Sequence, residues 1–476
     1  MIWLILLVAF VLRLFSLNQS LWLDEAINVV AVKSYTLLEM VTQYSIADFH
    51  PPGWFIILWI WGKIFGYSEI SVRFPSVVFG VLTILVTYLI GKKLVSGKFG
   101  LISALLLAIN PLHIYYSQEA RMYSMAAFAV TLNMYLFINL LKDYKENILS
   151  KIIYIFINIL ILMSDYVAYF IFPAQLIILL FVKNQAMIKR WVLNIVLSFV
   201  LTSWWISIFL NQLKVGSEAA INIPVWSTVV GAFGLKPLIL TYIKFIIGRI
   251  SFPNDIIYML VFIPIGTIFL YLIWRGFKST QKIARNYLVI WLFLPIIIAS
   301  LVSLVIPVYS YFRLLFVLPS FLILLAFGIY SFNKKLKLLF LFLIVMIEVI
   351  FSSTYLFNKN YHREDWKGLV LFLQSKSSNS KILFESSGSF SPFDYYAEDK
   401  LKGIGALKNF PAKNVYDLID LKNALGDSKD IYLVNYLVDI SDPNRLVSKQ
   451  LIELKYKQSE IKDFIGVGFI YHYVKE

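Results

Sequence analysis

An acidic pair, Asp24 and Glu25, directly follows the first apolar segment of the chain. The stretch Ala26–Val32 continues as an amphipathic helix, so both carboxylates are expected near a helix N-terminus, where the helix dipole favours negative charge. Carboxylates are among the side chains that serve in general acid–base chemistry. The plainer interpretation is an acidic pair at an ordinary helix start, which is a common arrangement.

His50 opens an HPP sequence, and its two prolines are expected to start a new helix over Gly53–Phe65. Three tryptophans in that helix favour a place at the interface between membrane and water. Taken on its own, a histidine at this place is typical of a helix-capping or hydrogen-bonded loop residue. Arg73 follows at the mouth of the next apolar segment, where snorkelling arginines are common.

The sequence YYSQEARMYSM places Glu119, Arg121 and Tyr123 at a turn between two apolar segments. A charged pair at such a turn costs desolvation, so it requires either a partner or a ligand. An internal salt bridge is one explanation. A phosphate site is the other, because a guanidinium presents a planar fork of donors to phosphate oxygens. Arg313, in VYSYFRLLFVLP, lies at another such mouth.

The composition shows what must position these residues. The chain has 476 residues, of which 59% are apolar and 15% charged, and its mean hydropathy is +0.76. Soluble chains carry about 25% charged residues, so this composition predicts a membrane protein. The absence of cysteine excludes disulfides, thiolate metal sites and a cysteine nucleophile. The net charge of +15 is not gathered on a soluble face, so no nucleic-acid partner is expected.

About eleven apolar segments approach the 20 or so residues that a spanning helix needs. They are Ile2–Leu17, Val72–Ile90, Phe99–Tyr115, Ser124–Leu141, Ile152–Met163, Tyr166–Val182, Trp191–Leu210, Ile256–Trp274, Tyr287–Pro307, Leu314–Tyr330 and Leu338–Phe357. The first contains Arg13 and lacks both a basic leader and a small-residue cleavage site, so we expect an uncleaved anchor.

Every second loop between spans lies on the same side of the membrane, and the basic residues of the short loops fall mainly on one of the two sides. The positive-inside rule places that side in the cytoplasm. The other side then carries three long pieces, residues 18–71, 211–255 and 357–476. We therefore expect a multi-pass protein of the cell membrane whose chemistry lies on the extracytoplasmic side.

The C-terminal piece has a different character from the rest. Residues 357–476 have a net charge of +1, against +14 for residues 1–356, and contain short apolar runs between polar turns. Helices are predicted at Glu364–Gln374 and Asn414–Leu425, and strands at Lys381–Glu385, Asp430–Asn435 and Val467–Val474. This order predicts a polytopic all-α membrane domain over 1–356, followed by a small extracytoplasmic α/β domain over 357–476.

Several motifs taken together resemble one family of membrane enzymes. They are LDEA, HPPGWFIILWIWGKIFG, SVRFPSVVFG, YYSQEARMYSM and YFRLLFVLP. They are similar to those of the polytopic GT-C glycosyltransferases, specifically the protein O-mannosyltransferase and aminoarabinose-transferase-like group, and the resemblance is best over residues 20–130. The sequence YHREDWKGLVLFLQ, which opens the tail, also looks like bacterial members. The resemblance implies a GT-C fold of about eleven spans with interfacial helices in the first outer loop.

Members of this group transfer one sugar from a polyprenyl-phosphate donor to an acceptor hydroxyl on the outer face of the membrane. The resemblance aligns Asp24 with their catalytic acid and Glu25 with its partner acid. It aligns His50 with their HPP histidine and Arg121 with the arginine of their QEAR sequence. A hydrophobic groove for the polyprenyl chain is implied as well.

The chemistry explains why one carboxylate can suffice. The donor leaves as a weakly basic phosphate, so the reaction needs a base for the acceptor and positive charge for the phosphate, but no strong general acid. The base is expected to be Asp24, and a single displacement implies inversion at the anomeric carbon. The predicted substrate-binding residues are His50, Arg73, Glu119, Arg121, Tyr123 and Arg313, with the three arginines facing phosphate.

The implied partners are a polyprenyl-phosphate-linked sugar donor, membrane lipid, and an envelope glycan, lipid or protein acceptor. The tail lacks the β-trefoil repeats of eukaryotic O-mannosyltransferases, which disfavours a protein acceptor. Asp24, Glu25 and His50 offer oxygen and nitrogen ligands for a divalent cation. GT-C enzymes differ in their need for one, so this cofactor stays open, and we expect none.

Two other functions fit part of the sequence. A transporter or flippase of lipid or glycan would also have many spans, but it predicts ionisable residues at mid-depth and inverted repeats. Here the charges cluster near the mouths of the segments, and only Glu348 is expected to be buried within a span. A non-catalytic membrane scaffold would tolerate the loss of Asp24.

Overall fold

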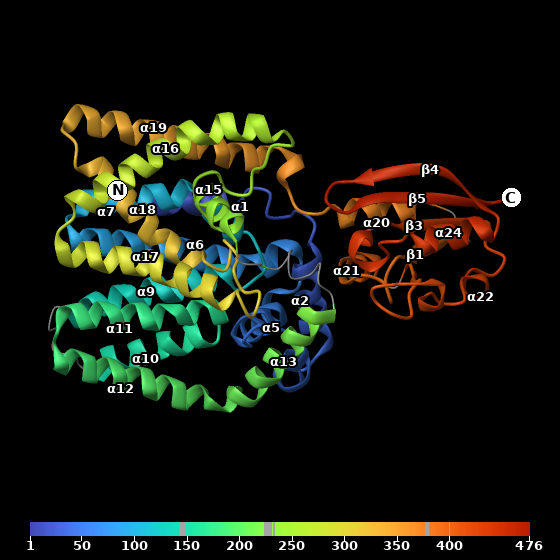
Figure 1. Ribbon diagram of the computed structural model, residues 1–476, viewed down its shortest axis with the longest axis horizontal. Coiled ribbons are helices and arrows are strands. Elements are labelled where there is room, and N and C mark those ends of the chain that lie inside the picture. Colours follow the sequence, from blue (N-terminus) through green and yellow to red (C-terminus); the bar gives the residue numbers. More distant parts are fainter. Residues whose placement is uncertain (142–147, 223–230, 232–233, 377–379, 399) are drawn as a thin grey trace. The chain divides into compact units, whose positions relative to one another are not determined.

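The computed structural model describes residues 1–141, 148–222, 231, 234–376, 380–398 and 400–476. These residues form two compact units, a helical one and one that contains a sheet (Figure 1). The helical unit is made chiefly of Met1–Leu17, Tyr35–Ala220 and residues 234–361. The second unit is made chiefly of Asn18–Ser34 and His362–Glu476. The first outer segment therefore divides between the units, which the sequence did not indicate.

Six helices of the first unit are long and apolar enough to cross a membrane. They are α6 (Glu69–Leu94), α9 (Tyr123–Leu141), α12 (Gln185–Thr202) running on into α13 (Ile206–Asn222), α16 (Asp255–Ser279), α17 (Lys282–Val302) and α19 (Lys334–Phe357). A seventh span is possible by length if the bent pair α7 (Gly97–Ile109) and α8 (Pro111–Ser117) counts as one.

The other predicted apolar segments are also helical, but they are shorter than a full span. They are α1 (Ile2–Leu14), α10 (Ile148–Leu162), α11 (Ile171–Val182) with the 3-10 turn before it, and α18 (Leu318–Tyr330) with the 3-10 turn before it. The helix predicted after the HPP sequence is α5 (Gly53–Phe65), and a further helix, α15 (Leu235–Ile247), precedes α16. Length supports six or seven spans, so the expected eleven remain a prediction.

The bend between α7 and α8 measures 63° and is held by buried polar groups. Asn110 caps α8, and its side-chain amide donates to the Phe245 carbonyl (2.9 Å) and to Glu348 Oε1 (3.2 Å). Ser352 Oγ donates to the Ile109 carbonyl at 2.6 Å. These side-chain hydrogen bonds supply partners for backbone groups near the bend, which a broken helix would otherwise leave unsatisfied. Glu348, the acid that falls within a span, accepts one of the hydrogen bonds of Asn110 and so lies against the bend.

Helices α16 and α18 approach each other closely at two glycines. A Cβ atom on Gly276 would lie 2.2 Å from the Leu324 carbonyl oxygen, and one on Gly328 would lie 1.9 Å from that of Leu272. Any larger residue would force the backbones apart, so these positions set the spacing of the pair.

The second unit contains a five-stranded sheet in the order β2-β1-β3-β5-β4 (Figure 1). The strands are β1 (Lys381–Phe384), β2 (Gly403–Gly405), β3 (Asp430–Val434), β4 (Tyr456–Phe464) and β5 (Gly468–Lys475). Strands β2, β1 and β3 run parallel, whereas β5 is antiparallel to both β3 and β4. This is the predicted α/β class, although the sequence did not indicate β2 or β4.

Helices cover both faces of this sheet because alternate strand residues point to opposite sides. On one face, Ile382 and Phe384 share a core with side chains of α20 (Trp366–Gln374) and α21 (Ser391–Ala397). On the other face, Leu383 shares a core with α22 and α24, which span Leu421–Leu425 and Leu446–Glu453. The prediction of helix α20 is confirmed.

The single helix predicted over Asn414–Leu425 is wrong. Residues 415–417 form a 3-10 turn, and Leu418 then pairs with Leu407 in an isolated bridge before α22 begins. The side chain of Asp420 caps α22 by accepting from the backbone of Asn423. Asn414 caps the 3-10 turn in the same way. These two caps, six positions apart, divide the segment that the apolar pattern suggested was one helix.

Candidate active site

The HPP segment of the helical unit is organised by Asp48, a carboxylate that the sequence analysis did not single out. Its Oδ1 accepts from the backbone N–H groups of Phe49 (2.7 Å) and His50 (2.9 Å) and lies 2.8 Å from His50 Nδ1. Burial alone would raise the pKa of Asp48, but His50, Arg121 and these hydrogen bonds keep it below its usual value. Asp48 therefore stays ionised and orients the imidazole.

The other ring nitrogen connects His50 to a distant part of the chain. Nε2 of His50 lies 3.3 Å from Nη2 of Arg121, 71 residues further on. Helix α5 supports this contact, because Trp54 Nε1 donates to the carbonyl of Ala120 at 3.0 Å. The fold thus brings together two of the predicted site residues, His50 and Arg121. Asp48 contacts the other ring nitrogen of His50.

Glu119, Arg121 and Tyr123 lie where α8 gives way to α9, as the sequence predicted for a turn. Glu119 and Arg121 are both buried, at 1% and 6% exposure. Ser76 Oγ of α6 donates to the Glu119 carbonyl at 2.5 Å, which fixes the turn. The Arg121 guanidinium lies 5.3 Å from the centre of the Tyr123 ring, within the range of a cation–π contact.

A second arginine, Arg249, joins this turn from the connection between α15 and α16. Its Nη1 donates to the Tyr115 hydroxyl at 3.1 Å, and the guanidinium lies 5.0 Å from the centre of that ring. Arg249 is an exposed residue, whereas Tyr115 and Tyr116 beside it are buried. A charged donor that water can reach, set among buried aromatic rings, suits an anionic ligand.

Neither Asp48 nor Arg249 was among the residues predicted from the sequence. Asp48 could have been found from its position in the sequence, two residues before His50. Arg249 belongs to none of the motifs. The only indication in the sequence was that it lies in 211–255, one of the three long pieces expected on the outer side.

The two other predicted arginines have different surroundings. Arg73 of α6 is fully buried, and its Nη1 donates to the carbonyl of Leu17 at 2.8 Å, which ties α6 to the segment after α1. Arg313 is half-buried, and Nη1 lies 3.5 Å from the Val308 carbonyl. Among the described residues, Arg313 Nε has no hydrogen-bond partner. Contact of either arginine with phosphate stays a prediction.

The acidic pair belongs to the second unit. Asp24 and Glu25 lie in the first turn of α2 (Leu23–Ser34), as expected. Glu25 is fully buried, and its Oε2 lies 3.5 Å from Nε of the equally buried Arg363. Asp24 is half-buried and interacts electrostatically with Glu364 and Tyr436. The two carboxylates therefore differ, because Glu25 has a buried cationic partner and Asp24 is the more accessible.

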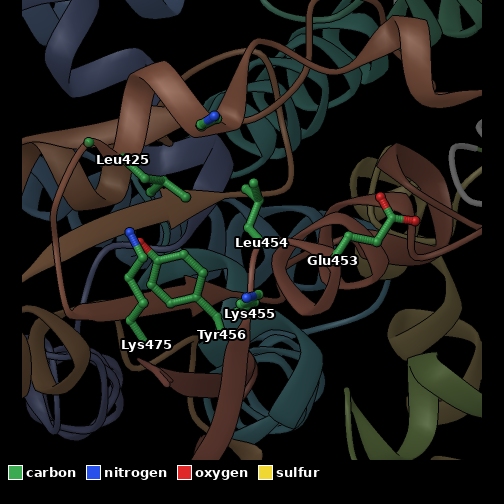
Figure 2. Close-up of a pocket in the computed structure, with 8 residues that line it drawn as sticks. Leu425, Glu453, Leu454, Lys455, Tyr456 and Lys475 are labelled. Carbon is green, nitrogen blue, oxygen red and sulfur yellow. The ribbon is translucent and has the colours of Figure 1, made fainter.

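The described residues form no metal centre at the predicted site, and a pocket of the second unit is lined by other residues. Among the residues that the structure describes, no three histidine, aspartate or glutamate side chains are grouped to hold a metal ion, so we assign no metal ligands. This pocket has a volume of about 230 Å³, and its walls include Leu425, Leu454, Tyr456 and Lys475 (Figure 2). The residues that line it include none of the predicted site residues.

The helical bundle with its α/β unit, and the contacts of the HPP and QEAR segments, agree with the resemblance to the GT-C membrane glycosyltransferases. Comparison with known proteins supports this resemblance. The sequence model of the family described as dolichyl-phosphate-mannose-protein mannosyltransferase matches residues 49–208. That segment contains His50, Arg73, Glu119 and Arg121, and it begins after Asp24.

Solved structures share the fold over nearly the whole chain. ArnT from Cupriavidus metallidurans, in a crystal structure with undecaprenyl phosphate, matches with a TM-score of 0.63 and 11% identity over 99% of this chain and 97% of that one. The archaeal oligosaccharyltransferase AglB from Archaeoglobus fulgidus, in complex with an inhibitory peptide and a dolichol-phosphate, matches with a TM-score of 0.54 and 13% identity over 99% and 74%.

A relative from Aquifex aeolicus, described as an uncharacterized protein, is 24% identical over 298 residues. The match spans 61% of this chain and 56% of that relative, so the chain covers little more than half of the relative's length.

Proposed function

We propose that this protein is a membrane glycosyltransferase that transfers one sugar from a polyprenyl-phosphate donor to an acceptor hydroxyl. One observation carries the proposal: the segment matched by the mannosyltransferase family contains His50 and Arg121, which meet at 3.3 Å in the fold. The ligands of the structurally similar proteins, undecaprenyl phosphate in ArnT and dolichol-phosphate in AglB, support a polyprenyl phosphate as the lipid carrier.

In the proposed reaction, Asp24 takes the proton of the acceptor hydroxyl as its oxygen attacks the anomeric carbon. The bond between that carbon and the phosphate oxygen breaks, and the polyprenyl phosphate leaves as an anion. Because this is one displacement, the anomeric configuration inverts. A general base and a cationic site for the leaving group each contribute on the order of 10²–10³ in rate.

The cations proposed to hold the phosphate are Arg121 and Arg249. Arg249 offers an exposed guanidinium beside Tyr115, and Arg121 lies beside His50, whose imidazole is oriented by Asp48. We assign Glu25 a structural role, since its partner is the buried Arg363. This separates the two acids, which the resemblance alone treats as a catalytic pair.

The reaction is proposed to take place on the extracytoplasmic side, as the distribution of basic loop residues indicates. A lipid-linked donor does not leave the bilayer, so the apolar helices α5 and α6 are suited to bind its chain. Keeping the sugar away from bulk water also prevents hydrolysis of the donor. The proposed acceptor is an envelope glycan or lipid, with a protein acceptor as the alternative.

The test is Asp24→Asn in the full chain, purified in detergent and reconstituted in liposomes with a polyprenyl-phosphate sugar. This change removes the base while keeping the size of the side chain, so transfer should fall at least 100-fold. Asp255→Asn, at an exposed aspartate in the first turn of α16, is the matched control and should leave transfer unchanged. Full activity of Asp24→Asn would refute the assignment of the base.

A second experiment tests the phosphate site. Arg121→Ala should raise the KM for the donor more than the KM for the acceptor, because the guanidinium is proposed to bind the phosphate that only the donor carries. Equal effects on both constants would contradict this role.

A further inference from the structure

The sequence that opens the tail, His362–Asp365 within YHREDWKGLVLFLQ, has no role in the proposed chemistry so far. In the structure it binds the stretch that leads into α2. The backbone N–H of Arg363 donates to Gln19 Oε1 at 3.1 Å, and that of Lys367 donates to Ser20 Oγ at 3.1 Å. These contacts join parts of one unit that lie more than 340 residues apart in the sequence.

Glu364 makes the contact closest to the acidic pair. Its Oε2 accepts from the backbone N–H of Leu23 (3.1 Å) and from Trp366 Nε1 (2.8 Å), and its Oε1 accepts from the Tyr436 hydroxyl (2.9 Å). Leu23 is the first residue of α2, and the first N–H groups of a helix have no partner within the helix. Glu364 therefore caps α2 with a carboxylate from a distant segment, which the helix dipole also favours.

Arg363 holds the same first turn of the helix. It pairs with Glu25 at 3.5 Å, and both side chains are buried. Successive residues of an α-helix point about 100° apart, so fixing Glu25 also fixes the direction of Asp24. The side chain of Leu23 adds an apolar contact, since it packs against the core formed by Trp366 and its neighbours.

We propose that Arg363 and Glu364 are positioning residues that hold the first turn of α2, so that the Asp24 carboxylate is presented to the acceptor in one orientation. This inference rests on the proposed function, because it takes Asp24 as the general base. Proton transfer from a bound hydroxyl requires heavy atoms about 2.6–3.2 Å apart, and small displacements of a catalytic group cost rate steeply.

The chain contains no cysteine, so a single engineered cysteine reports on the position of α2 without any substrate. Val29→Cys places the thiol at a fully buried position of α2, and Leu433→Cys places one at a fully buried position of β3. Each reporter is introduced into the full chain and labelled with a maleimide. Sugar transfer is measured on the same chains without the reporter cysteines.

Glu364→Ala should increase the labelling rate of Val29→Cys about tenfold or more and leave Leu433→Cys protected. It should lower kcat about 10–100-fold and change the KM for the donor less than threefold. Glu364→Gln keeps an oxygen that accepts from Leu23, so it should restore the protection of Val29→Cys. Glu453→Gln, at an exposed glutamate of α24 in the same unit, should change neither labelling nor kcat.

Three results would overturn the proposal. The first is that Glu364→Ala leaves kcat unchanged. The second is that kcat falls while Val29→Cys stays protected, because Glu364 would then act without holding α2. The third is that Glu364→Gln labels as fast as Glu364→Ala.

If Leu433→Cys also becomes reactive in Glu364→Ala, that variant has lost its fold, and Tyr436→Phe decides instead. This change removes one of the three hydrogen bonds to Glu364, so it should lower kcat several-fold with Leu433→Cys protected. An unchanged kcat in Tyr436→Phe would overturn the proposal. Absence of sugar transfer by the wild-type chain would refute the proposed function alone, since the labelling rates would still show whether Glu364 holds α2.

Discussion

Glu385 directly follows β1 and makes the stability of the second unit depend on pH. It is fully buried, and among the described residues neither of its carboxyl oxygens has a hydrogen-bond partner. Burial raises the pKa of Glu385 to about 8, the neighbouring Asp442 adds to the rise, and Arg445 opposes it. The folded protein therefore binds this proton more tightly than the unfolded chain does.

The sign and size of the effect follow from this difference. The ordinary pKa of glutamate is 4.5, so the folded state loses stability as the pH rises from 4.5 towards 8, and the loss levels off above 8. At 1.36 kcal/mol for each pH unit, the full loss is about 5 kcal/mol, of which about 3.5 kcal/mol falls between pH 5 and pH 8. This is a large part of the stability of a small domain.

The perturbation is Glu385→Gln, which removes the titrating group. A buried amide costs about 1–3 kcal/mol at any pH if its donors stay without partners, so the variant can be less stable at pH 5. Relative to wild type, however, its free energy of unfolding should rise by about 3.5 kcal/mol between pH 5 and pH 8. Comparing the two proteins at each pH cancels the contributions of every other group.

The assay is hydrogen exchange by mass spectrometry on peptides that cover β1 and β3 in the full chain at pH 5, 6.5 and 8. Differences between proteins at one pH are free of the intrinsic pH dependence of exchange. Glu453→Gln, at an exposed glutamate of α24, is the control and should show no such trend. A difference between Glu385→Gln and wild type that stays constant from pH 5 to pH 8 would refute the raised pKa.

Three further predictions concern other contacts. Arg363→Ala should destabilise the second unit by about 3–5 kcal/mol in denaturant unfolding, because it leaves Glu25 buried without its partner, and Glu25→Gln in that background should recover part of the loss. Gly328→Ala should lower the thermal stability of the bundle by about 1–3 kcal/mol, since its Cβ would meet the Leu272 carbonyl, and an unchanged melting curve would disprove the close approach. Arg249→Ala should weaken binding of a polyprenyl phosphate about tenfold or more in a direct binding assay, and wild-type affinity would exclude Arg249 from the phosphate site.

The fold could be predicted as far as local patterns extend. Every predicted apolar segment is helical, and the strands at Lys381–Glu385 and Asp430–Asn435 appear within a residue of their predicted limits. The helix over Asn414–Leu425 failed, because a capping residue can end a helix inside an apolar pattern. Strand β4 was missed because its middle seven residues are exposed and polar enough to lack an apolar alternation.

The candidate site could be predicted in part. The motifs singled out His50 and Arg121, which the structure places 3.3 Å apart, and their roles in binding stay predictions. The motifs did not distinguish Asp24 from Glu25, because the two residues are adjacent in the sequence. In the fold, Glu25 faces the buried Arg363, whereas Asp24 is half-buried. Arg249 was missed because a lone arginine in a loop has no pattern until Tyr115 lies beside it.

By itself, the sequence determined that the chain is a membrane protein, that its tail is an α/β unit, and that its charged motifs lie between apolar segments. Hydropathy and periodicity depend on neighbouring residues, so they are readable along the chain. Only the tertiary structure decided that Asp48 orients His50, that Arg249 joins the turn of Arg121, and that Glu364 caps the helix of Asp24. The last of these contacts joins residues 341 positions apart, and such pairings depend on how the elements pack rather than on any local pattern.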